Sequence, residues 1–206
     1  GVAGARSRRA PAHRSGSGSP GLRDPQGRSR SGSEEEAVRQ LMSARIGHGY
    51  DLHRLEPMAP AGAGRPFVLG GVRVPHDRGP VGHSDGDALL HAITDAILGA
   101  LGEPDIGQLF PDTDARWDGQ DSELFLAEAV RRMRERALRI GNLDATIICE
   151  RPKIGPAKAA IRANLARLLG CGEERVNLKG KTHEKVDAVG EGRAIEVHVV
   201  ALLESH

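Results

Sequence analysis

The sequence is poor in aromatic residues, in cysteine and in long apolar runs. Three Phe, one Trp and one Tyr among 206 residues cannot fill a core, so the interior must be built from aliphatic side chains. Two cysteines exclude a disulfide-stapled scaffold and favour a reducing compartment. No apolar run approaches the roughly 18 residues that span a bilayer, so we expect no membrane segment. A formal net charge of +1 argues against nucleic acid as the main partner.

The basic residues are unevenly distributed along the chain. Residues 1–33 contain seven Arg and a single acid, Asp24, and 21 of the 33 are Gly, Ala, Ser or Pro. Such a segment buries too little apolar area to offset the entropy lost on ordering, so we expect residues 1–44 to form a disordered leader. Its Arg-rich, Ser-rich and acid-poor composition is that of an organelle transit peptide, although an unselected tail or a linker would look similar. Residues 45–206 are expected to form one compact domain.

Hydrophobic periodicity predicts both strands and helices in that domain. Grouped helices among strands of mixed order favour an α+β fold, in which a mixed β-sheet carries its helices on one face. Strands are expected at 46–53, 143–149, 176–179 and 194–203, with two short strands about a Gly-Gly turn at 67–74. Helices are expected over 89–101, from Asp121 onward, and over 156–169, with Gly170 as the last C-cap.

Asp51 and His53 form the sharpest candidate site for chemistry. Side chains at i and i+2 of a strand point the same way, so this pair offers two metal ligands. His91, which shares a helix face with Asp87 and Asp95, is the best third ligand. One carboxylate and two imidazoles suit zinc with an open fourth position. A strand-end ion pair and a buried structural histidine would use the same residues.

Three polar stretches are candidates for binding phosphate, a polyol or a hard cation. Residues 83–87 precede a helix, whose N-terminus suits phosphate, although Ser84 or Asp85 would also serve simply as its cap. Residues 105–114 hold three carboxylates in a stretch that we expect to be a loop, either for a polyol or cation or as ordinary turn chemistry. Residues 179–185 hold three Lys, a Thr and a Glu, which suit phosphate and a bridging cation unless they form a plain charged loop. No Cys or Ser lies in a nucleophile motif, so we expect the nucleophile to be the substrate or water.

Four motifs, taken together, resemble a known enzyme family. The stretches RIGHGYDLH (45–53), GHSDGD (82–87) with His91, DIGQLFPDTD (105–114) and KTHEK (181–185) closely resemble the 2-C-methyl-D-erythritol 2,4-cyclodiphosphate synthases, and the likeness runs from about Arg45 to Glu204. It implies a lyase of the non-mevalonate isoprenoid pathway. Such an enzyme converts 4-diphosphocytidyl-2-C-methyl-D-erythritol 2-phosphate to the cyclic 2,4-diphosphate and releases CMP. The substrate's own 2-phosphate attacks its β-phosphorus, so catalysis would be positioning and charge neutralisation.

The resemblance also implies a homotrimer with active sites between subunits, and it gives roles to single residues. Asp51, His53 and His91 would bind one Zn²⁺ per active site, and Glu184 would bind a second cation, Mg²⁺ or Mn²⁺. His83 and Thr182 would stabilise the transition state. The cytidine nucleotide would lie against Lys153, Lys181 and Thr182. The methylerythritol phosphate pocket would be formed by Ser84, Asp105, Ile106, Gly107, Phe110, Pro111, Asp112, Thr113 and Asp114.

One stretch departs from bacterial members of the family. Where many of them carry a Phe and a Gly-Arg-Gly-Glu run, this chain has Ala188 and a displaced Arg193. Residues 181–187 and 75–79 look more like the plant and algal branch, which is plastid-targeted. We therefore expect a location in the plastid stroma, with a bacterial cytoplasm as the alternative.

Three other classes of protein fit parts of the pattern. A metal-dependent phosphohydrolase would use a metal-bound water and yield a linear product. A metal-binding structural subunit without activity would have no reason to keep all five of Asp51, His53, His91, Thr182 and Glu184. A nucleic-acid binder would act through the Arg-rich leader and would lose its binding without residues 1–40.

Overall fold

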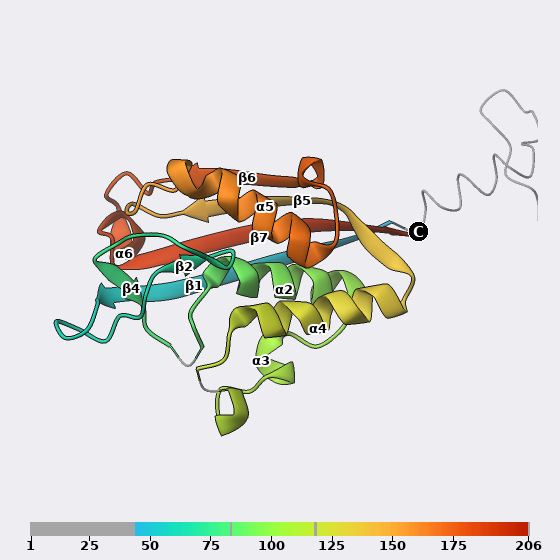
Figure 1. Cartoon of the computed structure of the whole chain (residues 1–206), viewed down its shortest axis with the longest axis horizontal. Coiled ribbons are helices and arrows are strands. Elements are labelled where there is room, and N and C mark those ends of the chain that lie inside the picture. The colour runs from blue at the N-terminus through green and yellow to red at the C-terminus, as the bar shows by residue number, and fades with distance from the viewer. Residues whose placement is uncertain (1–43, 83, 118, 206) are drawn as a thin grey trace, which may run out of the picture. The chain divides into compact units, whose positions relative to one another are not determined.

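A computed structural model describes residues 44–82, 84–117 and 119–205 (Figure 1). Residues 1–43 of the expected leader lie outside this part of the chain, and so does His83. The described residues belong to one compact unit, which carries the candidate sites.

The unit is built on a mixed five-stranded sheet with the order β4-β1-β7-β5-β6. β1 runs antiparallel to β4 and β7, β7 runs antiparallel to β5, and β5 and β6 are parallel. The predicted mixed sheet is therefore confirmed. The strands are β1 (Arg45–Pro57), β4 (Arg78–Pro80), β5 (Leu138–Ile148), β6 (Val176–Lys181) and β7 (Ala194–Ser205). A separate hairpin consists of β2 (Val68–Leu69) and β3 (Val72–Arg73).

Three longer helices cover one face of the sheet, as predicted (Figure 1). α2 packs on β1 and β7, α5 packs on β6, and α4 packs against α2 and β5. None of the described helices is both long enough and apolar enough to cross a bilayer. The helices are α2 (Ala88–Leu101), α3 (Ile106–Leu109), α4 (Ser122–Glu135), α5 (Lys158–Leu169) and α6 (Asp187–Gly190), with 3₁₀ turns at Ala115–Trp117, Gly155–Ala157 and Glu173–Arg175.

Two glycines bring the backbone of β1 directly against α2. A Cβ atom added at Gly47 would lie 1.8 Å from the carbonyl oxygen of Ala96, and one at Gly49 would lie 1.8 Å from that of Ala92. No real Cβ atom tolerates such a distance, so only glycine fits these two positions. The close contact sets the ligand-bearing end of β1 beside the first turns of α2.

A buried carboxylate fixes the start of α2. Asp87 is the N-cap and has no exposed surface. Its oxygens accept hydrogen bonds from the backbone N–H groups of Leu89 (3.1 Å) and Leu90 (3.0 Å), and from Gly70 (2.9 Å) and Gly71 (2.7 Å) in the β2–β3 turn. The expectation that Ser84 or Asp85 caps this helix is therefore wrong, because the carboxylate that reaches both the helix and the turn belongs to Asp87, two residues beyond Asp85.

Several short elements differ from the sequence-based expectation. The stretch 105–114 is not all loop, because α3 forms within it with Asp105 and Gln108 as a capping box. The four-residue α6 follows 179–185, where no helix was expected. The last long helix begins at Lys158 rather than at Pro156, because Gly155–Ala157 forms a 3₁₀ turn before it.

The other face of the sheet carries apolar side chains that nothing covers within the described residues. On β1, Ile46, Tyr50 and Leu52 are 71%, 47% and 48% exposed, and on β7 Val200 is 45% exposed. Together we call them the bare face. The intervening residues of β7, such as Val197 and Val199, point into the core and are fully buried.

Candidate active site

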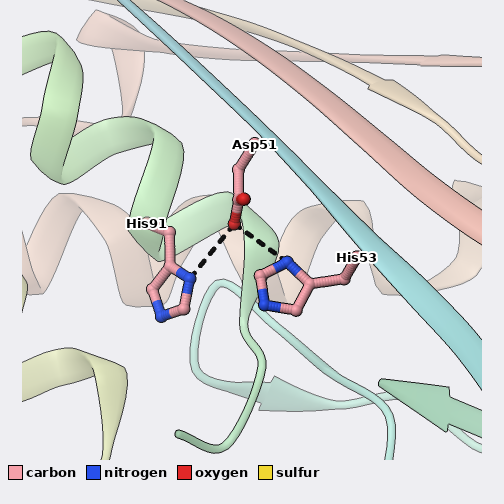
Figure 2. A group of neighbouring side chains, drawn as sticks. All are labelled: Asp51, His53 and His91. Carbon is pink, nitrogen blue, oxygen red and sulfur yellow. Dashed lines mark hydrogen bonds and ion pairs between the residues drawn. The ribbon is translucent and has the colours of Figure 1, made fainter. Parts of the chain in front are cut away.

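Asp51, His53 and His91 lie together at the junction of β1 and α2 (Figure 2). The Nδ1 atoms of His53 and His91 lie 3.0 Å and 3.1 Å from the same oxygen of Asp51, Oδ2. One ligand atom from each of the three residues lies within 4.8 Å of the others. The predicted grouping of these three side chains is confirmed.

The donor set of this group fits a divalent cation. His53 Nδ1 is buried and has no hydrogen-bond partner in the described structure, although it faces the Asp51 carboxylate. Buried polar atoms are rarely left without a partner. A cation among the two ring nitrogens and the carboxylate oxygen would satisfy this nitrogen, and two imidazoles with one carboxylate are typical ligands of zinc and similar metals.

The three side chains are strongly coupled electrostatically. Burial raises the pKa of Asp51, but its close contacts with the imidazoles of His53 and His91 outweigh burial and bring the pKa down to about 2. Burial lowers the pKa of His91, but its hydrogen bond to Asp51 and the charge of that carboxylate outweigh burial and leave the pKa raised. The carboxylate therefore stays ionised at neutral pH and attracts either a proton on His91 or a cation in its place.

A first cavity, of about 260 Å³, opens beside the metal group. His53 and His91 form part of its wall. Ser84, a predicted substrate residue, also contributes, and its Oγ lies 3.3 Å from His91 Nε2. The complete lining is His53, Gly82, Ser84, His91, Ile106, Gly107, Phe110, Asp112, Trp117 and Phe125.

Four residues predicted for the substrate pocket lie outside this wall. Asp105 instead caps α3, accepting a hydrogen bond from Gln108 N at 2.8 Å. Asp114 accepts from the Arg116 guanidinium at 3.0 Å. Pro111 and Thr113 line none of the cavities. The structure does not place His83, which lies outside the described residues.

Sequence reasoning predicted Phe110 but missed the other two aromatic residues of this wall, Trp117 and Phe125. The ring centroid of Phe110 lies 5.1 Å from that of Trp117 and 4.7 Å from that of Phe125. Three of the five aromatic residues of an aromatic-poor chain therefore meet at one cavity. Because aromatic residues are so scarce in this chain, each of them could have been examined as a candidate site residue. Phe125, however, also fits the buried face of a helix, so the sequence alone did not indicate that it lines a cavity.

A second cavity, of about 510 Å³, lies at the end of β6 and is lined by the residues predicted to bind the nucleotide and the second cation. Lys153, Lys181, Thr182 and Glu184 all line it, and Thr182 Oγ1 donates to Glu184 Oε1 at 2.9 Å. Lys158 is a further cation in its wall that the sequence did not suggest. The two cavities have no lining residue in common.

Cys149, in the wall of the second cavity, is not a nucleophile. Burial raises the pKa of its thiol to about 12, so the thiolate is absent at neutral pH.

Comparison with known proteins places these features in one family. Residues 44–204 match the family described as the YgbB family. The chain belongs to the YgbB family. It is 58% identical over 80% of its length to the chloroplastic 2-C-methyl-D-erythritol 2,4-cyclodiphosphate synthase of Catharanthus roseus, of which it covers 67%. It is 60% identical over 82% of its length to the chloroplastic synthase of Arabidopsis thaliana, of which it covers 70%.

A solved structure supports the same assignment. The chain resembles the IspF of Plasmodium falciparum in complex with CDP, with a TM-score of 0.68 and 38% identity over 79% of this chain and 96% of that one. The YgbB match spans the metal group and the lining of both cavities.

Proposed function

We propose that this chain is a 2-C-methyl-D-erythritol 2,4-cyclodiphosphate synthase. It converts 4-diphosphocytidyl-2-C-methyl-D-erythritol 2-phosphate to the cyclic 2,4-diphosphate and releases CMP, in the supply of isoprenoid precursors. The observation that carries this proposal is the Asp51–His53–His91 group, whose two histidines line a cavity, on a chain 60% identical to a plant synthase of that name.

Asp51, His53 and His91 are assigned to one Zn²⁺, and Glu184 to Mg²⁺ or Mn²⁺. Three protein ligands are typical of a catalytic rather than a structural zinc site. When bound, the two cations supply Lewis-acid polarisation and charge neutralisation of the diphosphate. Thr182, whose hydroxyl donates a hydrogen bond to Glu184, is assigned with His83 to stabilising the transition-state charge of the diphosphate.

The first cavity is assigned to the methylerythritol phosphate end of the substrate. Asp112 and Ser84 offer polar contacts, while Phe110, Trp117 and Phe125 exclude water from the reacting phosphates. The excluded water matters because the attacking group is an oxygen of the 2-phosphate. A new P–O bond forms from that oxygen to the β-phosphorus, and the bond from the β-phosphorus to the CMP oxygen breaks. The other predicted substrate residues, Asp105, Ile106, Gly107, Pro111, Thr113 and Asp114, keep that assignment as part of the proposal.

The second cavity is assigned to the CMP end. Lys153, Lys158 and Lys181 surround it with positive charge, which stabilises the phosphate of the leaving nucleotide.

We assign each complete site to two copies of the chain. The family resemblance implies active sites between subunits, so the first cavity of one subunit is paired with the second cavity of its neighbour, and the separate linings of the two cavities are compatible with that pairing. The bare face of the sheet, with Ile46, Tyr50, Leu52 and Val200, offers the apolar surface for such an assembly. The number of copies, three, follows the resemblance to the family.

The plastid stroma is the proposed location. The plant relatives are named chloroplastic, and residues 1–44 have the composition of a transit peptide. Import of a reporter fused to residues 1–44 into isolated chloroplasts tests this assignment, and a reporter left outside would refute it.

The reaction is tested by ³¹P NMR of the purified protein with substrate, Zn²⁺ and Mg²⁺. The expected result is cyclic diphosphate appearing in step with CMP, and neither product with His91→Ala. CMP with a linear product would indicate a phosphohydrolase, and no CMP from the wild type would indicate a structural subunit. Either result would overturn the proposal.

A further inference from the structure

We propose that Ser122 and Asp85 form a relay behind the metal group that holds His91 in the tautomer required for metal binding. The inference deepens the proposed function and rests on it for the presence of the metal. Ser122 lies in none of the four motifs, Asp85 received no role beyond that of a possible helix cap, and neither residue lines the two cavities.

The imidazole of His91 is held from both sides of its ring. Nδ1 faces Asp51 Oδ2 at 3.1 Å (Figure 2), and Nε2 lies 2.8 Å from the hydroxyl oxygen of Ser122. Ser122 is the first residue of α4 and is fully buried. Its hydroxyl bonds to Asp85 Oδ1, and its backbone N–H donates to Asp85 Oδ2 at 3.3 Å. The series of contacts Asp51–His91–Ser122–Asp85 therefore connects β1, α2, α4 and the segment before α2.

Counting protons along this line selects one tautomer. An ionised carboxylate only accepts hydrogen bonds, so the hydroxyl proton of Ser122 points to Asp85. The Ser122 oxygen then faces His91 as an acceptor, and the proton between them must be on Nε2. In the neutral ring, which is the form that binds a metal, Nε2–H is the single N–H, so the Nδ1 lone pair that faces Asp51 is available to a cation. Outer partners of this kind orient metal-bound histidines and raise their basicity.

Ser84 is a second neighbour of the same nitrogen but a weaker candidate. Its Oγ lies 3.3 Å from His91 Nε2, against 2.8 Å for Ser122. Ser84 also lines the first cavity, where a bound substrate would compete for its hydroxyl. Ser122 lies outside that lining and has no exposed surface, so its contact persists whether or not the cavity is filled.

The proposal is tested by Zn²⁺ affinity, measured on the full chain by competition with a chelator. Ser122→Ala is expected to weaken binding by about 10- to 100-fold, the usual loss for an outer partner. Ser122→Thr keeps the hydroxyl and is expected to restore nearly wild-type affinity. Thr94→Val is the matched control: it also removes a fully buried hydroxyl, one that bonds to Leu90 O on α2 at 2.7 Å, and it should leave affinity unchanged.

Asp85→Asn tests the outer end of the relay. It should weaken Zn²⁺ binding in the wild-type background and add little to Ser122→Ala, because Asp85 acts through Ser122. If Asp85→Asn weakened Zn²⁺ binding as much in Ser122→Ala as in the wild type, Asp85 would not act through Ser122 and the relay would be wrong at its outer end.

¹⁵N NMR of the zinc-loaded wild type reads the tautomer directly and needs no variant to fold. The expected signals are a protonated Nε2 and a metal-bound Nδ1 on His91. A metal-bound Nε2, or tight binding by wild type and Ser122→Ala alike, would overturn the relay alone. A wild type that binds no Zn²⁺ would overturn the proposed function and the relay with it.

Discussion

At the scale of single residues, the Asp51–His91 contact makes metal binding a competition with a proton. The pKa of His91 is raised, chiefly by the Asp51 carboxylate acting against burial. We expect Zn²⁺ affinity to increase as the pH rises through that raised value, because the metal binds only the neutral ring. Chelator competition from about pH 5 to about pH 8 measures this, and an affinity that does not change with pH would contradict it.

Without metal, the same contact predicts the opposite trend for stability. Because the pKa of His91 is raised in the folded state, protonation of His91 stabilises the fold. This contribution is complete below pH 6.5, the ordinary pKa of histidine, and is lost as the pH rises through the higher folded-state pKa. Asp51, with a pKa lowered to about 2, contributes above its ordinary 3.8 and loses its contribution as the pH falls toward 2. The Tm of the chelator-treated protein should therefore fall as the pH rises above about 6.5. In His91→Ala the Tm should no longer show this decrease.

Glu184 gives a second prediction at this scale. Glu184→Gln removes a charge that Mg²⁺ or Mn²⁺ prefers, so the cation concentration for half-maximal turnover should rise by roughly tenfold. Zn²⁺ content should stay at the wild-type level, because Glu184 lines the second cavity and not the first. Glu191→Gln is the control, since that carboxylate pairs with Arg193 and lines no cavity. An unchanged cation titration for Glu184→Gln would refute the assignment.

Two glycines contrast sharply at the scale of elements. Gly47→Ala places a Cβ atom 1.8 Å from the Ala96 carbonyl oxygen, so β1 and α2 must separate, at a cost of about 1–3 kcal/mol or more. Gly99→Ala, within α2 itself, meets only ordinary contact at 3.8 Å and should stabilise by about 0.5–1 kcal/mol. Denaturant unfolding of both variants measures the contrast. Equal effects would show that the contact between β1 and α2 does not depend on glycine.

The long elements of the fold could be predicted from the sequence, because periodicity is a local signal. The short ones could not. β4 has three residues and exists through its pairing with Leu55–Pro57 of β1, and α3 and α6 span one turn each. The N-cap of α2 was also misplaced, because the choice of Asp87 depends on two N–H groups from Gly70 and Gly71, which are distant in sequence.

The candidate site divides in the same way. The metal group was predictable because Asp51 and His53 lie two apart on one strand and His91 belongs to a recognisable motif. Trp117, Phe125 and Lys158 were not, because they reach the cavity walls only through packing between separate elements.

At the scale of the whole molecule, the bare face predicts an assembly. Leu52→Glu puts a charge on a surface that we expect to be buried between copies, so it should yield monomers by size-exclusion chromatography with light scattering. Turnover should be lost, because we assign each active site to two neighbouring copies, while Zn²⁺ content per chain should persist, because the three proposed ligands come from one chain. Leu124→Glu, at a 41% exposed position on α4, is the control and should remain assembled. A Leu52→Glu variant that keeps the wild-type mass would contradict the role of this face.

The single tryptophan gives the protein an optical property of its own. Trp117 stands in the wall of the first cavity, edge-on to Phe110, and the sequence contains no other tryptophan. All indole emission therefore originates at one wall. A polyol phosphate entering that cavity changes the surroundings of the fluorophore, whereas a nucleotide in the second cavity of the same chain meets a lining without it. Occupancy of the first cavity can thus be followed by intrinsic fluorescence of the unlabelled protein.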